Sequence, residues 1–302
     1  MSKTQKMFSS LANTRFYSFL VTLFLLSTTS FVDETSAEII QQYQIPLPFT
    51  LEEHEIGKLY SVAEASKEET GGGEGIEIVK NEPYEDEKMY HGKGQYTRKI
   101  FHLAQKVPAF IRLLAPKGSL EIHEKSWNAY PFCKTIYSNP DYMKGSLNIT
   151  IETVHKSGRP DDEENRNAQP FIGKPIIIDI VNDPIEPRDY REDEDPSKCR
   201  SMKTGRGPLS KNWKEIQGDY PMMTSFKHYE IKFKWWGLQT RVEKIIQKFV
   251  RRLLLKFHRQ MFCWMDRWYG MTMADIRMME AETKIELDKL RRQGEVHGMK
   301  EQ

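Results

Sequence analysis

The chain has 302 residues, of which 29% are charged and 38% hydrophobic, and its formal net charge is +2. This composition is typical of a soluble globular protein with one large domain or two small ones, and the near-neutral charge gives no reason to expect nucleic acid as a partner. Three cysteines, Cys133, Cys199 and Cys263, are far apart and lack metal-ligand spacing. We therefore expect reduced thiols, with neither a disulfide framework nor a metal site.

Residues 1–37 have the features of a targeting segment. Basic residues precede an apolar run between Phe16 and Leu26, and small residues follow it as far as Ala37. This order is typical of a secretory signal peptide or a short signal anchor, because the run is shorter than the ~20 residues of a spanning helix. An alternative N-terminus with no part in the fold fits equally. The unpaired cysteines favour a domain that works on the cytosolic side.

The first predicted strand spans residues 41–48, and a helix follows it. Thr50 and Glu53 form a Thr-x-x-Glu capping pattern, and the helix is predicted to end near Ser66. The glycine run at 71–75 has no strand before it and no Lys-Ser/Thr of a phosphate-binding loop after it, and its acidic neighbours would repel phosphate. We therefore predict a flexible loop at this position.

Four further segments are predicted from hydrophobic patterning. Residues 76–79 form a short strand that ends at a turn beginning with Asn81, and residues 94–103 form a longer strand. Residues 106–114 are amphipathic, with a proline near the first turn. The continuous apolar run at 175–181 predicts a well-buried strand.

Several predicted strands share an unusual polar pattern. Each has an apolar stretch on one face and small polar or charged side chains at one end of it. These side chains are Thr97 and Lys99, then Glu124, Ser126 and Asn128, then Cys133 and Thr135, and finally Lys227. If the faces line one cavity, it is apolar along its length and polar at one end, which suits an amphiphile with a buried head group. The alternative is that these residues face water.

Lys227 begins a strand that leads to two adjacent tryptophans and then a long helix. A buried lysine without a partner is costly, so Lys227 is expected to meet an anion. Trp235 lies on the apolar face, and Trp236 lies beside lysines on the other. A tryptophan beside lysines suits a membrane–water interface. Burial of both rings at a strand–helix corner is the alternative.

The C-terminal part of the chain is predicted to be helical. Helical spacing of apolar residues from residue 238 predicts a helix of about 30 residues that Gly270 ends. Thr272, with Asp275 three residues on, predicts the start of a last helix, and Glu280 lies near the apolar stripe of that helix. Ser201 follows an arginine and is a candidate phosphorylation site.

Motifs of catalysis are absent from the sequence. It has no Gly-x-Ser-x-Gly elbow, no His-Glu-x-x-His, no Walker pattern and no paired metal-ligand motif. We therefore expect a protein that is not an enzyme and that has no resident cofactor.

Six segments of the chain closely resemble the single-domain phosphatidylinositol transfer proteins. In chain order they are SVAEAS at 61–66, TGGGEG at 70–75, GQYTRK at 94–99, HEKSWNAYP at 123–131, KTGRGPL at 203–209 and KFKWWGLQ at 232–239. The resemblance covers roughly residues 38–300. It implies an α+β fold of the START-like helix-grip type, in which long helices close a curved, mostly antiparallel sheet over one lipid cavity. We accordingly divide the chain into a leader at 1–37, a transfer domain at 38–295 and a tail at 296–302.

The resemblance also implies roles for individual residues. Those expected around the inositol phosphate head group are Thr97, Lys99, Glu124, Asn128, Thr135, Lys227 and Glu280. Cys133 matches a position near the choline head group of an alternative ligand, and Ser201 matches a phosphorylatable serine beside the entrance. Trp235 and Trp236 match a membrane-docking pair.

The function implied is extraction, shielding and exchange of phosphatidylinositol, and of phosphatidylcholine, between membranes. The phospholipid would be cargo rather than a cofactor, and the protein would be a monomer that touches membranes transiently. An alternative is an adaptor that presents phosphatidylinositol to a lipid kinase. The resemblance implies a cytoplasmic and peripheral-membrane location, although the leader leaves a secretory or anchored form open.

Overall fold

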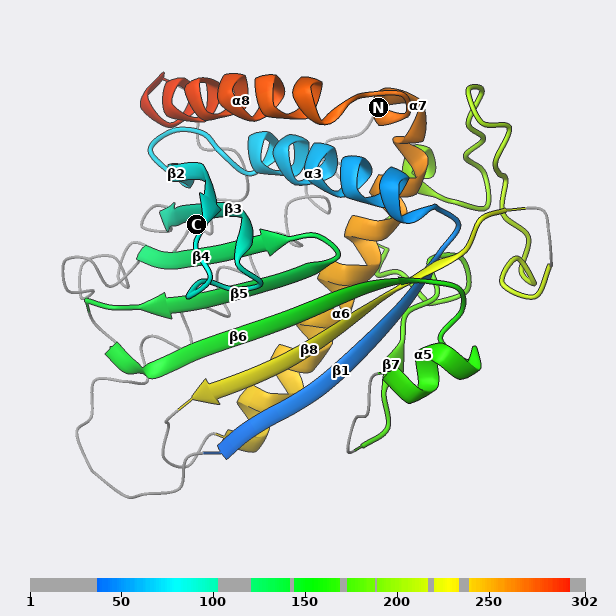
Figure 1. Ribbon diagram of the computed structural model, residues 1–302, viewed down its shortest axis with the longest axis horizontal. Helices are drawn as coiled ribbons and strands as arrows, with labels where there is room; N and C mark the ends of the chain where they lie inside the picture. The colour runs from blue at the N-terminus through cyan, green and yellow to red at the C-terminus, as the bar shows by residue number, and fades with distance from the viewer. Residues whose placement is uncertain are drawn as a thin grey trace, which may run out of the picture.

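The computed structural model describes residues 37–102, 121–141, 144–168, 173–187, 189–216, 220–233 and 239–293 (Figure 1). Its elements in chain order are β1 (Ala37–Leu47), α3 (Leu51–Glu68), β2 (Gly75–Glu85), β3 (Lys93–His102), β4 (Glu121–Ala129), β5 (Phe132–Asn139), β6 (Lys144–Ser157), α5 (Glu163–Ala168), β7 (Ile176–Ile177), η2 (Glu192–Glu194), β8 (Met223–Phe233), α6 (Gln239–Cys263), α7 (Met265–Trp268) and α8 (Met273–Gln293).

The described strands form one eight-stranded sheet with the order β2-β3-β4-β5-β6-β8-β1-β7. Every pairing is antiparallel except that of β1 with β7. Figure 1 shows a strongly curved sheet, with α6 crossing behind it and with α3 and α8 side by side along its β2–β4 end. The predicted α+β fold with a curved, mostly antiparallel sheet is therefore confirmed.

The hydrophobic core lies at one end of the covered face. It joins β1 and β8 to the C-terminal half of α6 and to α7, and its fully buried side chains include Tyr43, Phe49, Trp213 and Trp268. Among the described residues, no member of this core comes from β2, β3, β4 or β5. In the described part of β2–β5, the buried apolar side chains are Ile76, Tyr84 and Ala129, which lie outside this core.

Both predicted helix starts are confirmed. The Thr50 hydroxyl accepts the N–H of Glu53 at 3.1 Å, and the Glu53 carboxylate accepts the N–H of Thr50 at 2.9 Å. Thr272 and Asp275 make the same reciprocal pair at the start of α8, at 3.2 and 2.7 Å. Each pair satisfies two of the amide donors that a helix leaves free at its N-terminus.

The turn predicted at Asn81 is wrong, because β2 continues through it to Glu85. The strand has a bulge between Ile78 and Lys80 and then pairs Asn81 with Thr97. β2 is at the edge of the sheet, where a proline such as Pro83 removes no ladder hydrogen bond that a neighbour needs. The local turn signal was therefore overridden by pairing with β3.

The glycine segment is a hydrogen-bonded turn, so the predicted flexible loop is corrected. The N–H groups of Gly72 and Gly73 donate to the carbonyls of Leu290 and Arg291, at 3.2 and 2.7 Å. These carbonyls lie in the last turn of α8, where they have no partner within the helix. The turn therefore caps α8 from a part of the chain about 220 residues away.

The strand predicted at 175–181 is almost entirely irregular. Only Ile176–Ile177 pair with β1, and Ile177 is 49% exposed, whereas Ile178 is fully buried. The Asp179 carboxylate accepts the N–H groups of Val181 and Asn182, at 3.0 and 3.1 Å. This side-chain turn competes with the ladder and ends the strand.

Two further predictions about the C-terminal half are corrected. Cys199 and Cys263 form a disulfide with a Cα–Cα distance of 5.4 Å, and only Cys133 is a free cysteine. Spacing along the chain could not show that the loop containing Cys199 folds against the end of α6. The long helix also stops at Cys263 instead of continuing to Gly270, and Trp268 of α7 donates its ring N–H to the Met261 carbonyl at 2.9 Å.

Candidate functional site

The strand register places the predicted polar residues on one face of the sheet. Directly paired residues of antiparallel strands project to the same side. One row across four strands runs Asn128, Cys133, Thr153, Lys227. The next row runs Thr97, Ser126, Thr135, and the third runs Lys99, Glu124, Tyr137. This face carries α3 and α8, which bond to it through Lys58–Asn128 and Glu280–Asn81.

Lys99 and Glu124 compensate each other's charge. They are paired residues of β3 and β4, their charged atoms are 3.2 Å apart, and their side chains are only 14% and 7% exposed. Burial raises the pKa of Tyr137 well above its usual value, and the neighbouring Glu124 carboxylate adds to the increase. The Glu124 carboxylate thus neutralises the Lys99 ammonium group, and the phenol of Tyr137 stays protonated.

A second polar network joins Thr97 to α8. Asn81 accepts from Gln95 at 2.7 Å and from Thr97 at 3.4 Å, and it donates to Glu280 at 2.9 Å. Arg277 completes the network with an ion pair to Glu280 at 2.6 Å. Except for Thr97, these residues line a pocket of about 470 Å³ between β2, β3 and α8. Sequence analysis missed Asn81 because it placed a turn there.

Lys58 of α3 enters the same site and was not predicted. Its ammonium group donates to Asn128 at 3.0 Å and lies 5.3 Å from the ring centre of Tyr130. Burial lowers its pKa below the usual value. The preceding Gly57 permits this placement, because a Cβ there would lie 2.9 Å from the Trp268 ring. The sequence carries no local signal for Lys58, since lysines on a helix are mostly solvated.

Lys227 of β8 has no hydrogen-bond or ion-pair partner among the described residues. Burial lowers its pKa to about 8, and the positive charge of Lys58 contributes to the lowering. The residue nevertheless keeps some accessible surface. Lys227 is therefore a cation that an anionic ligand could neutralise.

Small polar side chains of β4 and β5 lie on the sheet between Lys227 and the place where Lys58 contacts Asn128. The Ser126 and Thr135 hydroxyls are 3.0 Å apart, and the Cys133 thiol lies 3.7 Å from the first and 3.9 Å from the second. Each hydroxyl can also donate to or accept from a ligand. The arrangement therefore offers two cations and several hydrogen-bonding groups on one wall.

Two other predicted sites are located differently. Trp235 and Trp236 lie outside the described residues, so their docking role stays a prediction. Ser201 is buried, donates its hydroxyl hydrogen to Asp266 and accepts the N–H of Thr204 at 3.0 Å. A kinase would reach Ser201 only after its loop leaves Asp266, and its phosphorylation also stays a prediction.

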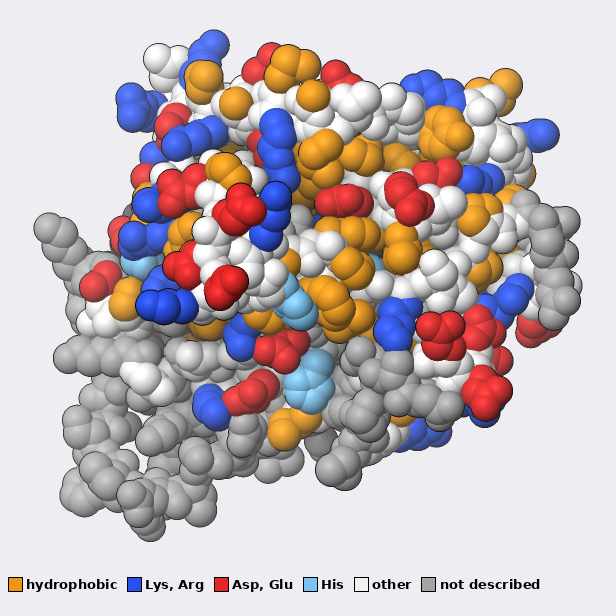
Figure 2. Space-filling model, in the orientation of Figure 1, with side chains coloured by type: hydrophobic (Ala, Val, Ile, Leu, Met, Phe, Trp, Pro, Cys, Tyr) orange, Lys and Arg blue, Asp and Glu red, His pale blue; other side chains and the backbone are white. Residues whose placement is uncertain are grey.

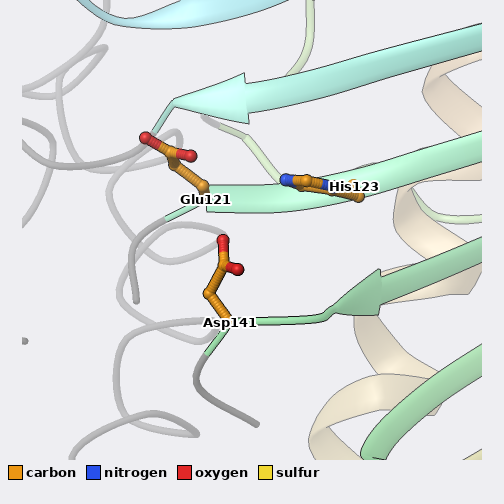
Figure 3. A group of neighbouring side chains, drawn as sticks. All are labelled: Glu121, His123 and Asp141. Atoms are coloured by element: carbon orange, nitrogen blue, oxygen red, sulfur yellow. The ribbon is translucent and has the colours of Figure 1, made fainter. Parts of the chain in front are cut away.

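One group of potential metal ligands lies away from this site. Glu121, His123 and Asp141 bring one ligand atom each within 4.8 Å of the others (Figure 3). The strand register puts Glu121 and His123 on the opposite face of the sheet from Glu124 and Asn128. Partly exposed carboxylates commonly gather without an ion, so this geometry alone assigns no metal.

Among the described residues on the face shown in Figure 2, acidic and basic side chains are intermixed and form no basic stripe of the kind that follows a nucleic-acid backbone. Among the helices that the structure describes, none combines the length and apolar character that crossing a bilayer requires.

Comparisons with known proteins place this site in context. The family model described as phosphatidylinositol transfer protein matches residues 38–285. The chain is 51% identical over 267 residues to the phosphatidylinositol transfer protein beta isoform of Homo sapiens, covering 86% of this chain and 97% of that protein. It is 47% identical to phosphatidylinositol transfer protein 2 of Dictyostelium discoideum, covering 83% and 96%. It is 41% identical to the membrane-associated phosphatidylinositol transfer protein 2 of Mus musculus, covering 83% of this chain and 19% of that protein.

Proposed function

Since the chain belongs to the phosphatidylinositol transfer protein family, we propose that residues 38–295 extract phosphatidylinositol, and also phosphatidylcholine, from one membrane and deliver it to another. The physical obstacle is desorption. Each CH₂ group is worth ~0.8 kcal/mol of burial, so exposing two acyl chains to water costs tens of kcal/mol. A carrier must replace that burial and must also satisfy the head group.

The observation that carries this proposal is the wall of polar side chains under α3 and α8. Lys227, which has no partner in the described residues, would neutralise the phosphodiester, and Thr135 would bond its oxygens. Thr97, Asn128 and Glu280 would bond the inositol hydroxyls together with the Lys99–Glu124 pair. In the phosphatidylcholine complex, Cys133 would lie near the choline.

We further propose that exchange occurs one lipid for one at a membrane surface, with Trp235 and Trp236 in the interface and α8 moved aside. Such a motion would break the bonds of α8 to Asn81, Gly72 and Gly73 and its ion pair with Glu77. Lys67 pairs with Glu286 at 3.1 Å, but Glu286 is 48% exposed. An exposed pair of this kind is worth only about 0–1 kcal/mol.

A single hydroxyl deletion tests the head-group assignment. Thr97→Ala should lower phosphatidylinositol transfer between vesicles at least about tenfold and spare phosphatidylcholine, because choline has no hydroxyls to bond. The matched control is Thr150→Ala, which removes a hydroxyl from the opposite face of β6. Transfer of both lipids is followed with a label on each, in the absence of any kinase.

Equal loss of both lipids in Thr97→Ala would show that the hydroxyl is structural. A purified protein that moves no phosphatidylinositol without a lipid kinase would favour the adaptor alternative. The proposal contains no catalytic step and no cofactor besides the lipid cargo, so the lipid recovered from acceptor vesicles should be chemically intact.

We propose that the protein is a monomer that works at cytoplasmic membrane surfaces. The thiol argument for this location no longer holds, because Cys199 and Cys263 are bonded. Disulfides persist mainly in oxidising compartments, so the Cys199–Cys263 bond weighs against this location, and the proposal rests on the family resemblance. Rapid alkylation of thiols during cell lysis therefore tests the proposal, and a fully oxidised Cys199–Cys263 pair in cells would contradict it.

A further inference from the structure

The Cys199–Cys263 disulfide ties an irregular segment of the chain to the end of a helix. Cys199 lies between η2 and β8, and Cys263 is the last residue of α6. Both residues keep some accessible surface and pack against the hydrophobic core from outside it. The bond therefore lies at the margin of the packed core, where a small thiol in solution can approach it.

A carboxylate holds the same segment a few residues further along. The Ser201 hydroxyl and the N–H groups of the next two residues all donate to Asp266 of α7, the two amides at 2.8 and 3.1 Å. Ser201 follows Cys199 by two residues, and Asp266 follows Cys263 by three. The disulfide and this group of hydrogen bonds are thus neighbouring ties between the same two parts of the chain.

Ion pairs fix the segment on either side of these two ties. Asp195 pairs with Arg259 of α6 at 3.2 Å, and Arg206 pairs with Glu53 of α3 at 2.6 Å. The side chains of both pairs are at most 16% exposed. Residues 196–205, which we call the clamp segment, are therefore the part that can move when the ties to α6 and α7 are lost.

The hydrogen bonds of the clamp segment are open to water. Met202 is 84% exposed, and the Lys203 ammonium group donates to the Tyr269 carbonyl at 3.0 Å from an exposed position. Because water competes for such groups, the net stability of each bond is small. A covalent link two residues away keeps Ser201 close to Asp266 at a high effective concentration, which these bonds alone do not provide.

The surroundings of the two sulfur atoms differ. Cys199 is flanked by Lys198 and Arg200, both exposed, and positive neighbours stabilise a thiolate. Cys263 lies at the C-terminus of α6, where the partial negative charge of the helix end destabilises a thiolate. Cys199 is therefore the better leaving group, and an incoming thiolate attacks the Cys263 sulfur.

We propose that Cys199 and Cys263 form a redox site for glutathione, and that its oxidation state decides whether the clamp segment stays on Asp266. A glutathione thiolate bonds to the Cys263 sulfur, and the electrons of the disulfide bond leave with Cys199. A second glutathione thiolate attacks the first glutathione, which releases glutathione disulfide and the Cys263 thiolate. The protein gains two electrons, and both of its thiolates take up protons from water.

The reverse reaction with glutathione disulfide restores the bond. Cytosolic disulfides are usually transient and redox-sensing, so this exchange fits the location proposed above. In the reduced protein the clamp segment leaves α7, and the Ser201 hydroxyl becomes accessible to a modifying enzyme. The site thus adds a regulatory state to the protein that is separate from its lipid site.

The first arm of the test measures the exchange. The purified full chain is incubated without denaturant in an excess of either glutathione disulfide or glutathione, its thiols are alkylated, and its peptides are weighed by mass spectrometry. Cys199 and Cys263 should be bonded in the first buffer and alkylated in the second, and the change should reverse. A pair that changes only in denaturant overturns the proposal.

The second arm follows the clamp segment by amide hydrogen exchange. Reduction should speed exchange at the amides of Met202 and Lys203 at least about tenfold, because they lose Asp266. The amides of Gly72 and Gly73, which bond to carbonyls of α8, should be unaffected. Cys199→Ser should show the fast exchange in both glutathione buffers.

Cys133→Ser is the matched control, because Cys133 is the free cysteine of the chain and its loss should leave the redox response in place. Unchanged exchange at Met202 and Lys203 on reduction overturns the proposal. Equally faster exchange at the glycine turn does so too, since reduction would then loosen the whole fold, and so does a response that persists in Cys199→Ser. None of these measurements uses lipid, so their failure leaves the proposed transfer function standing.

Discussion

At the scale of single residues, Lys227 is a desolvated lysine with no hydrogen-bond or ion-pair partner in the described part of the protein. Its pKa of about 8 lies below the ordinary lysine value of 10.5, with burial as the main cause. Each pKa unit corresponds to 1.36 kcal/mol between the two protonation states. The charged form therefore costs roughly 3 kcal/mol in the lipid-free protein, which an anionic ligand would offset.

This depressed pKa sets the sign of two pH effects. Between pH 8 and 10.5 the unfolded chain binds more protons at this lysine than the folded chain, so its contribution makes the free energy of unfolding of the lipid-free protein rise with pH. Binding of an anionic lipid has the opposite dependence. It uses the protonated form, so affinity should fall as pH rises above about 8.

We predict that the ratio of bound phosphatidylinositol to phosphatidylcholine falls severalfold between about pH 7 and pH 9.5, as measured by lipid extraction after loading. The charged or titratable groups that act on Lys227 from other elements are His54 and Lys58 on α3, Cys133 on β5, His155 on β6 and His258 on α6. Lys227→Gln should remove most of the dependence. A ratio that still falls by the same factor in that variant would assign the effect to one of these neighbours.

At the scale of elements, the glycine turn at 71–75 shows how a local pattern takes its meaning from a distant partner. Glycine-rich runs bind phosphates in other folds, but here the N–H groups of Gly72 and Gly73 are used by the last turn of α8. Gly75 closes the turn at a φ of 107°. The Thr70 hydroxyl accepts the N–H of Ile76 at 3.0 Å across it.

Gly75→Ala should lower the free energy of unfolding by about 2–4 kcal/mol, because its φ is strained for an L-residue and its Cβ would lie 2.5 Å from Thr70 Cα. Gly205→Ala is the control. Gly205 has a φ of 74° and no atom lies within 4 Å of the new Cβ. The expected loss of unfolding free energy is therefore only the cost of a left-handed backbone conformation for an L-residue, about 1–2 kcal/mol. Denaturant unfolding measures both, and equal losses would mean that the contact with Thr70 is relieved by movement of the turn.

At the scale of the whole molecule, transfer requires a membrane contact in addition to a lipid site. We predict that replacing both Trp235 and Trp236 with Ala lowers vesicle-to-vesicle transfer at least about tenfold, because tryptophan rings favour the interface. Bound lipid and the thermal unfolding midpoint should be retained. Trp127→Ala on the outward face of β4 is the control, and the docking role is refuted if the double variant transfers lipid at the wild-type rate.

Residues 38–285, which match the family model, include most of the described elements, and the core and the polar wall occupy different ends of one face. This division suits a carrier. The packed end at β1, β8 and α6 can hold the fold together while the β2–β5 end exchanges its contents. The residues that bear the unpaired charges, Lys58 and Lys227, lie near the boundary between the two ends.

The sequence by itself determined which side chains share a face. Alternation along a strand is a local property, so the order of residues alone groups Thr97 with Lys99 and Glu124 with Asn128. The capping pairs at Thr50 and Thr272 are recognisable for the same reason, because both partners of each pair lie within one helical turn.

Only the tertiary structure decided which of these local units meet. Asn81 became part of the site because β3 paired with β2 beyond the apparent turn. Lys58 meets Asn128 across 70 residues, and Cys199 meets Cys263 across 64. Such contacts depend on the packing of helices against a curved sheet, which no short stretch of sequence specifies.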